Sequence, residues 1–252
     1  MNRSAWSPHL RAIGIAVMIA ALAIGVTKYV LTPVVFLVFE VISVTLPAWA
    51  SLTLSVLLQQ GLVFGSIAAG YLWVRDLDLG WIGLSRPSLK EALWIGLGWI
   101  MAFGSVVGLL IVVLLLGLNP GQNQIQGLVA ENPDLIPLLI VLTIVLIGPG
   151  EELLFRGIIQ GSLRERFGPM TAIILASVIF ASAHVGSLTG SLGDRAITVG
   201  VLLVPSLIFG IAYERTNNLV VPSLIHGLYN ATLFSITYVG LKYGPTTPAV
   251  LF

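Results

Sequence analysis

Residues 135–163 read LIPLLIVLTIVLIGPGEELLFRGIIQGSL, an apolar run interrupted by two adjacent carboxylates and an arginine. A helix that crosses a bilayer needs about 20 mostly apolar residues, and this run is long enough. Ionisable side chains at membrane depth are costly unless they face protein or water and find a partner. The stretch therefore predicts a membrane span that carries a functional site.

The composition extends this interpretation to the whole chain of 252 residues. Apolar residues make up 57% and charged residues only 9%, whereas a soluble domain has about 25% charged residues. The lipid bilayer is therefore the expected surrounding. The net charge of +1 leaves no broad basic face, so we expect no nucleic-acid partner. Cysteine is absent, which excludes disulfides, thiolate metal sites and a cysteine nucleophile.

Apolar runs of suitable length predict seven spans, at about 12–31, 48–74, 91–117, 135–163, 169–184, 196–214 and 219–240. The segment 33–47, PVVFLVFEVISVTLP, is apolar but short, and it could lie at the interface, re-enter, or form an eighth span. The predicted fold class is all-α: a polytopic transmembrane helical bundle of seven to eight spans. We expect one membrane domain, 1–252, with N-terminal helices at 1–134 and a motif-bearing core at 135–240.

The basic residues outside the spans predict the orientation, because cationic loops stay cytoplasmic. In a seven-span bundle one end holds the basic residues Arg3, Arg11, Arg75, Arg86, Lys90, Arg164, Arg166 and Arg215. The loop 118–134, at the other end, has two acids and no base. An eighth span would move the basic N-terminus to the other side, so seven spans are preferred. The first run lacks a persuasive cleavage site and is read as a retained span rather than a signal.

Pairs of small residues spaced four apart lie on one face of a predicted helix, where backbones can approach closely. Three such pairs occur: Gly61/Gly65, Gly104/Gly108 and Gly157/Gly161. We expect them to pack helices rather than to mark function.

Most charged residues fall in predicted loops or at helix ends, where solvated or snorkelling side chains are ordinary. Lys28 and Lys242 are read in the same way. The ionisable and amide side chains left inside the predicted motif-bearing spans are few: Glu151, Glu152, Arg156, His184, His226 and Asn230. Each is a candidate functional residue, because a polar group at membrane depth is costly and usually marks a functional site.

Helical geometry separates the roles of the two glutamates. Glu152 and Arg156 are four residues apart, so on a helix they can neutralise each other through a charge-assisted hydrogen bond. Glu151 is rotated from Glu152 by about 100° and must find other partners. The sequence GPG at 148–150 is expected to interrupt or kink the helix just before these acids.

The same four-residue spacing puts Phe180 with His184 on one helical face, and His226 with Asn230 on one face of another. Three helices could then direct Glu151 and these polar groups into one pocket. A glutamate can accept a proton from water as general base, and a histidine can hold that water and pass on the proton. A second histidine and an amide can donate hydrogen bonds to the oxyanion formed when water attacks a carbonyl.

The sequence also bears on other chemistries. H-E-x-x-H and G-x-S-x-G are absent, and no aspartate lies within a predicted span. Ser182 is read as a small packing residue. A zinc ion held by Glu151, His184 and His226 stays possible, because two histidines and one carboxylate can bind zinc. A transporter, proton relay or membrane scaffold could use the same buried network.

Three motifs of the chain resemble those of the CAAX protease and bacteriocin-processing (CPBP) family of intramembrane glutamate proteases, also called type II CAAX prenyl endopeptidases. EELLFR at 151–156 fits E-E-x-x-x-R, FASAH at 180–184 fits F-x-x-x-H, and HGLYN at 226–230 fits H-x-x-x-N. Each motif alone is a weak signal, but the three together, in order on three motif-bearing spans, are specific. The resemblance covers about the last 110 residues, and the N-terminal third matches only in being apolar.

The resemblance implies a helical bundle with a cavity that opens to the cytoplasmic side. It implies that Glu151 and His184 activate water and that His226 and Asn230 form the oxyanion hole. The reaction would be endopeptidase cleavage of a membrane-associated protein or peptide, which could carry a prenylated C-a-a-X tail. No cofactor is expected, and the location would be a prokaryote-like cell membrane, as a multi-pass integral protein.

The resemblance also implies a supporting role for Glu152 with Arg156, and it makes Phe180 a packing or substrate-wall residue. Two features of the chain fit the family pattern less well. The family core has eight helices, whereas the tail after Gly240 is too short to cross. His184 lies near the far end of its span and His226 near the start of its own, so strong tilts are needed to bring them level.

Overall fold

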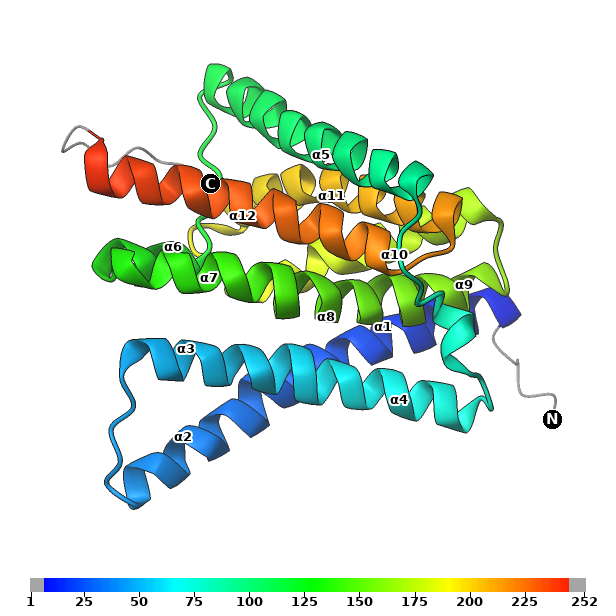
Figure 1. The fold of residues 1–252 in the computed structure, drawn as a ribbon, viewed down its shortest axis with the longest axis horizontal. Coiled ribbons are helices and arrows are strands. Elements are labelled where there is room, and N and C mark those ends of the chain that lie inside the picture. The colour runs from blue at the N-terminus through cyan, green and yellow to red at the C-terminus, as the bar shows by residue number, and fades with distance from the viewer. Residues whose placement is uncertain (1–6, 245–252) are drawn as a thin grey trace.

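The structure, a computed structural model, describes residues 7–244, and every named element in this range is helical. Figure 1 shows long helical rods running back and forth beside one another as a bundle. We number them rods 1 to 7, and they span Pro8–Val41, Ala48–Val74, Leu89–Leu115, Pro133–Arg164, Pro169–Ser187, Leu192–Thr216 and Val220–Tyr243. The predicted all-α polytopic bundle is confirmed.

The rods are built from shorter α-helical, π-helical and 3₁₀ elements. Rod 1 contains α1 (Pro8–Val26), the π-helical η1 (Thr27–Leu31) and α2 (Thr32–Val41). Rod 2 contains α3 (Ala48–Val56), the π-helical η2 (Leu57–Phe64) and α4 (Gly65–Val74). Rod 3 is α5 (Leu89–Leu115), and the short elements η3 (Leu79–Ile82) and α6 (Gln124–Glu131) lie in the connections on either side of it.

Rod 4 has the most segments: η4 (Pro133–Leu135), α7 (Ile136–Leu142), η5 (Thr143–Ile147), α8 (Gly148–Glu152), η6 (Leu153–Gln160) and α9 (Gly161–Arg164). Of these, η5 and η6 are π-helical. Rod 5 is α10 (Pro169–Ala183) with the 3₁₀ turn η7 (His184–Ser187). Rods 6 and 7 are α11 (Leu192–Thr216) and α12 (Val220–Tyr243).

Six helices within residues 7–244 are long and apolar enough to cross a membrane, and they are rods 1 to 6. Rod 7 has 24 residues, so its length suffices. Polar side chains such as those of His226 and Asn230 lower its hydropathy. With residues such as Trp73 and Leu115 more than four-fifths exposed, the outer surface suits lipid better than water. The chain is an integral membrane protein.

The interpretation of 33–47 as a separate element is wrong. Residues up to Val41 continue rod 1 as α2, and 42–47 form the connection to rod 2. No eighth span exists in the described range. Rod 1 passes Pro33 because the π-helical turn η1 ends two residues before it, with the N–H of Thr32 bonding to the carbonyl of Thr27. A π turn adds one residue to the helix, which relieves the clash and the missing donor that proline brings.

Rod 4 passes Pro149 in the same way. The π-helical η5 ends two residues earlier, and the N–H of Gly148 bonds to the carbonyl of Thr143. The GPG sequence therefore lies inside a continuous rod, and the expected interruption takes the form of a π turn just before it. Glu151 and Glu152 consequently stay on a helix.

Contacts between connections show which loops share an end of the bundle. Arg75 pairs with Glu165 at 2.9 Å, and Arg164 pairs with Glu214 at 2.8 Å. His9, near the start of rod 1, stacks against Phe167 with ring centroids 5.0 Å apart. We call this the basic end, because it holds Arg75 and Arg164 of the predicted basic loops, whereas Arg195 at the start of α11 and Lys242 at the end of α12 lie at the other end. Arg3 and the tail 245–252 lie outside the described residues.

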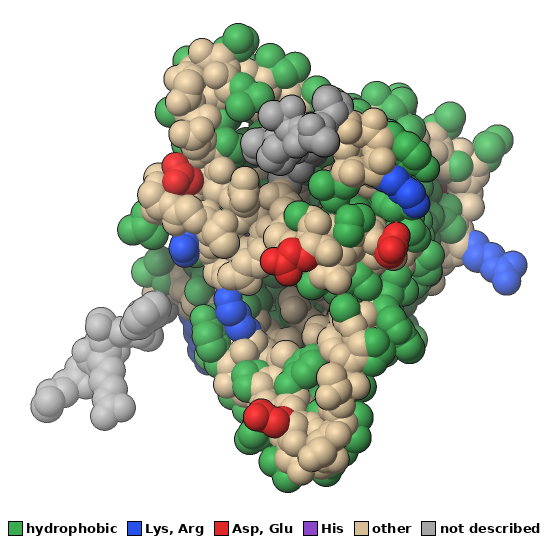
Figure 2. Space-filling view, turned by 90° about the vertical axis from the view of Figure 1, so that its left-hand side faces the viewer, with side chains coloured by type: hydrophobic (Ala, Val, Ile, Leu, Met, Phe, Trp, Pro, Cys, Tyr) green, Lys and Arg blue, Asp and Glu red, His purple; other side chains and the backbone are tan. Residues whose placement is uncertain are grey.

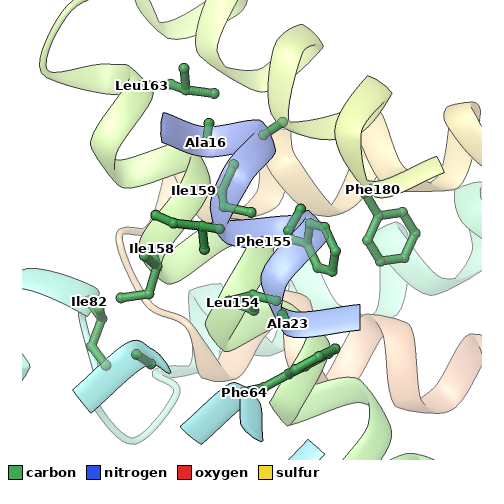
Figure 3. Packing of buried hydrophobic residues seen from close by; sticks show 14 of the residues in the cluster. Ala16, Ala23, Phe64, Ile82, Leu154, Phe155, Ile158, Ile159, Leu163 and Phe180 are labelled. Carbon is green, nitrogen blue, oxygen red and sulfur yellow. The ribbon is translucent and has the colours of Figure 1, made fainter. Parts of the chain in front are cut away.

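The largest buried cluster lies where rods 1, 2, 4 and 5 meet. Figure 3 shows Ala16 and Ala23 of rod 1 against aliphatic and aromatic side chains of rod 4, with Phe64 below and Phe180 beside Phe155. The rings of Phe155 and Phe180 meet edge to face at 5.0 Å. The small side chains of rod 1 let it lie close to rod 4, which holds the acids in place.

Candidate active site

One large cavity, of about 810 Å³, lies inside the bundle. Its lining includes Glu151 of α8, Phe180 of α10, His184 of η7, and His226 with Asn230 of α12. Three rods thus bring together the side chains that the sequence singled out as catalytic candidates. Glu151 is 13% exposed in its side chain and His226 only 5%, so both groups are largely shielded.

Glu152 and Arg156 form a fully buried ion pair, with 2.9 Å between Oε2 and Nε and no exposure of either side chain. Arg156 also donates from Nη2 to Ser206 Oγ at 2.9 Å, and its guanidinium lies 5.2 Å from the ring centroid of Phe180. The four-residue spacing predicted this pair. The contact with Ser206 of α11 shows that Arg156 also ties rod 4 to rod 6.

Close approach of rods 4 and 7 brings the glutamates to His226. A Cβ added at Gly148 would lie 2.8 Å from the carbonyl oxygen of Ser223, and one added at Gly227 would lie 3.0 Å from Cα of Ile144. Only glycine fits at such a crossing. The glycine pairs predicted from the sequence are not the ones at this crossing. Gly157 and Gly161 face side chains of other segments. A Cβ at Gly61, Gly65, Gly104 or Gly108 would meet nothing within 4 Å among the described residues.

The imidazole of His226 lies between the two glutamates. Its Nδ1 is 2.9 Å from Glu152 Oε1, and its Nε2 is 3.9 Å from Glu151 Oε2. The ring of Phe209 stacks on it, with centroids 4.8 Å apart and planes 19° apart. A carboxylate accepts hydrogen bonds, so Nδ1 carries a proton toward Glu152 and Nε2 is directed at Glu151 and the cavity.

His184 stands at the junction of α10 and η7. Its Nδ1 lies 2.9 Å from the carbonyl oxygen of Phe180, which can only accept, so Nδ1 carries the proton and Nε2 has a free lone pair. The ring of Phe180 lies 4.7 Å from that of His184 and 5.8 Å from that of His226. The two imidazoles are therefore separated by one aromatic ring, and the expected difference in depth does not keep them apart.

Several residues of the site were missed by the sequence interpretation. Gln60 of η2 donates from Nε2 to Glu151 Oε1 at 3.1 Å, and it is buried. Ser206 and Phe209 hold Arg156 and His226 from α11. A signal existed for Gln60, since the pair QQ at 59–60 interrupts an apolar span, but its partner could not be known.

Lys28 differs from its predicted place at a helix end. It lies within η1 in the interior of rod 1, lines the cavity, and donates to the carbonyl of Gly186, two residues after His184. Lys242 lies in the last turn of α12 and donates to the hydroxyl of Tyr238, as a helix-end lysine should. Lys28 thus links rod 1 to the turn that carries His184.

A metal site formed by Glu151, His184 and His226 was left open by the sequence. These side chains line the same cavity, yet within residues 7–244 no group of three His, Cys, Asp or Glu is arranged to hold a metal ion. The arrangement suits proton transfer and hydrogen-bond donation, because each imidazole has one nitrogen engaged by the protein and the other directed inward.

The cavity extends toward the end of the bundle opposite the basic end. Its outer lining comes from 120–126 and 186–188, and none of the described residues at 75–90, 164–168 or 215–219 contributes. Figure 2 views this opposite face, where a few charged side chains are scattered among hydrophobic ones. A cytoplasmic basic end and a cytoplasmic cavity mouth were both expected, and this geometry makes the two expectations incompatible.

Comparison with known proteins bears on the same region. Residues 133–232 match a family model described as Rce1-like, Type II CAAX prenyl endopeptidase Rce1-like. The match includes EELLFR, FASAH and HGLYN, the three motifs whose side chains meet in the cavity. No curated protein and no solved structure matches the chain. The family resemblance seen in the motifs is confirmed.

Proposed function

We propose that this chain, whose residues 133–232 match the Rce1-like type II CAAX prenyl endopeptidase family model, hydrolyses a peptide bond of a membrane-associated protein or peptide. The observation that carries the proposal is the convergence of Glu151, His184, His226 and Asn230 on one cavity. The family suggests substrates with a prenylated C-a-a-X tail, and the setting would be a prokaryote-like cell membrane.

In the proposed mechanism Glu151 is the general base, and His184 holds the water molecule and relays its proton. Among the described residues no donor lies within hydrogen-bond distance of Oε2 of Glu151, whereas Oε1 accepts from Gln60. His184 offers the lone pair of Nε2, because Nδ1–H is donated to the carbonyl of Phe180. A water molecule that bonds to both groups would lose its proton as it attacks the substrate carbonyl.

His226 and Asn230 are the proposed donors to the oxyanion. Donation from Nε2 of His226 requires the doubly protonated ring, since its Nδ1–H already faces Glu152. Each donor to a developing oxyanion contributes typically about 3 kcal/mol.

The proposed reaction proceeds by direct attack of water and needs no covalent intermediate with the enzyme. The water oxygen bonds to the carbonyl carbon, the water proton moves to Glu151, and the carbonyl electron pair becomes the oxyanion. When that pair re-forms the carbonyl, the C–N bond breaks, and the leaving nitrogen takes a proton from Glu151 by way of His184. The products are a carboxylic acid and an amine, and Glu151 is again ionised.

The test uses purified full-length protein in vesicles and a fluorogenic peptide ending in a C-a-a-X sequence, with and without a prenyl group. Glu151→Gln should lower kcat by about 10²- to 10⁴-fold while the protein elutes and melts as the unchanged chain does. Retained cleavage would contradict the mechanism. A relay or transporter would be favoured if the unchanged protein showed no peptidase activity and Glu151→Gln abolished a proton-coupled flux instead.

Metal dependence is tested in the same assay. We propose that catalysis needs no metal. Activity should therefore survive thorough chelation, and elemental analysis of the chelated protein should find no stoichiometric metal. Activity that is lost on chelation and restored by zinc would assign Glu151, His184 and His226 as metal ligands instead.

A further inference from the structure

Gln60 is the one described residue outside rods 4 to 7 that donates a hydrogen bond to a proposed catalytic side chain. It lies in η2 of rod 2, and its Nε2 is 3.1 Å from Oε1 of Glu151, 91 residues away in sequence. The family match begins at residue 133, so Gln60 lies outside the matched region.

The contact is built into the packing of rods 2 and 4. Gln60 is 7% exposed, and a Cβ added at Gly150 would lie 2.8 Å from its Cβ and 3.1 Å from its Cα. Glycine at 150 therefore lets the backbone just before Glu151 rest directly on Gln60. The π-helical turn η2 sets the direction of this side chain, and such turns are frequent at functional sites.

The two oxygens of the Glu151 carboxylate consequently have different surroundings. Oε1 accepts from the amide of Gln60, whereas Oε2 lies 3.9 Å from Nε2 of His226, beyond hydrogen-bond length. A water about 2.8 Å from both of these atoms would subtend an angle of about 90°, which suits a bridging water. The neutral amide holds the carboxylate without adding a charge that would compete with His226.

We propose that Gln60 is a positioning residue for Glu151: its amide N–H holds Oε1 so that Oε2 is the oxygen that takes the proton from water. This inference rests on the proposed function, because it assigns which atom of the base reacts. A purely space-filling role for Gln60 makes a different prediction, since then only the shape of the side chain would matter.

The chain contains a matched control in Gln160 of η6. Gln160 is fully buried, donates from Nε2 to the carbonyl of Gly210 at 3.1 Å, and has its Oε1 against that glycine. Gln60 likewise donates once from Nε2, and its Oε1 lies against Gly150. Both Oε1 atoms lack a hydrogen-bond partner among the described residues. Gln160 does not line the cavity, so it shares the structural properties of Gln60 without the contact to Glu151.

The kinetic test compares Gln60→Met, Gln60→Glu and Gln160→Met on the same prenylated peptide. Gln60→Met keeps the length of the side chain and should lower kcat by about 10- to 100-fold with KM changed less than about threefold. Gln60→Glu keeps the shape but places a second carboxyl group against Oε1 of Glu151, where the two repel or share one proton, so Glu151 becomes a poorer base and kcat should fall at least as far. Gln160→Met should keep the original kcat although it lowers the melting temperature.

A second readout does not depend on activity. Infrared difference spectra assign the carboxylate band of Glu151 by its loss in Glu151→Gln, and this band should shift in Gln60→Met but not in Gln160→Met. An unshifted band, or kcat at the original level in Gln60→Met or Gln60→Glu, would overturn the inference. An equal loss of kcat in Gln160→Met would do the same. Cleavage that survives Glu151→Gln would overturn the proposed function, a separate outcome from these.

Discussion

At the scale of single residues, Arg156 shows how this protein keeps full charges in its interior. Its guanidinium bonds to Glu152 and Ser206 and lies over the ring of Phe180, so three rods surround it. Glu152 in turn bonds to His226. Removing one member would leave the others buried and without their counter-charge, which is the costly way to break such a network.

Arg156→Met should lower the free energy of unfolding by about 3–5 kcal/mol, because Glu152 would keep its charge without its partner. The matched control is Arg75→Met, which removes an arginine whose pair with Glu165 is 43% and 32% exposed and should cost less than about 1 kcal/mol. Denaturant unfolding in detergent measures both variants. Equal losses in the two would contradict a structural role for the buried pair.

At the scale of elements, π-helical turns carry some of the polar residues that reach the cavity. Lys28 lies in η1 and Gln60 in η2, and both line it. Arg156 lies in η6, immediately after the two glutamates. A π turn shifts the angular position of the residues around it, so the simple four-residue spacing of an α-helix does not predict where Lys28 or Gln60 points.

The crossing of rods 4 and 7 is the contact on which the site depends most. Gly148→Ala should destabilise the protein by about 1–3 kcal/mol, because the added methyl group would overlap the backbone of α12. The same change moves the glutamates away from His226, so cleavage should fall further than stability alone explains.

Gly104→Ala is the control for this crossing. No atom of another element lies within 4 Å of the new methyl group among the described residues. A helical alanine in place of glycine should leave stability unchanged or raise it by up to about 1 kcal/mol. A neutral Gly148→Ala variant would show that rods 4 and 7 can separate at no cost.

At the scale of the whole molecule, orientation decides where the cavity opens. The basic end and the cavity mouth lie at opposite ends of the bundle. The rule that cationic loops stay inside then directs the mouth away from the cytoplasm. The family resemblance implies the reverse, so the two arguments make opposite predictions for the same loops.

The absence of cysteine allows a direct measurement of this orientation. Ser85→Cys at the basic end and Asn119→Cys at the opposite end both place a thiol at an exposed position. By the charge rule, a membrane-impermeant maleimide applied to intact bacterial cells should label Asn119→Cys and not Ser85→Cys. The opposite labelling would reverse the orientation and place the cavity mouth on the cytoplasmic side.

The sequence by itself determined the membrane class, the approximate spans and the pairing of Glu152 with Arg156. These features are local: a hydrophobic run has a length, and two residues four apart on a helix are neighbours whatever surrounds them. The association of Glu151, His184, His226 and Asn230 was also anticipated. The spacings within the three motifs place the polar side chains on single helical faces, and these faces must turn toward one another to avoid lipid.

Only the tertiary structure decided the contact between Gln60 and Glu151, the position of His226 between two carboxylates, and the direction in which the cavity extends. These depend on how rods tilt, cross and approach, which is set by glycines at backbone contacts and by π turns that rotate side chains. Residues 91 or 74 positions apart meet through packing, and no local pattern in the chain encodes the distance between them.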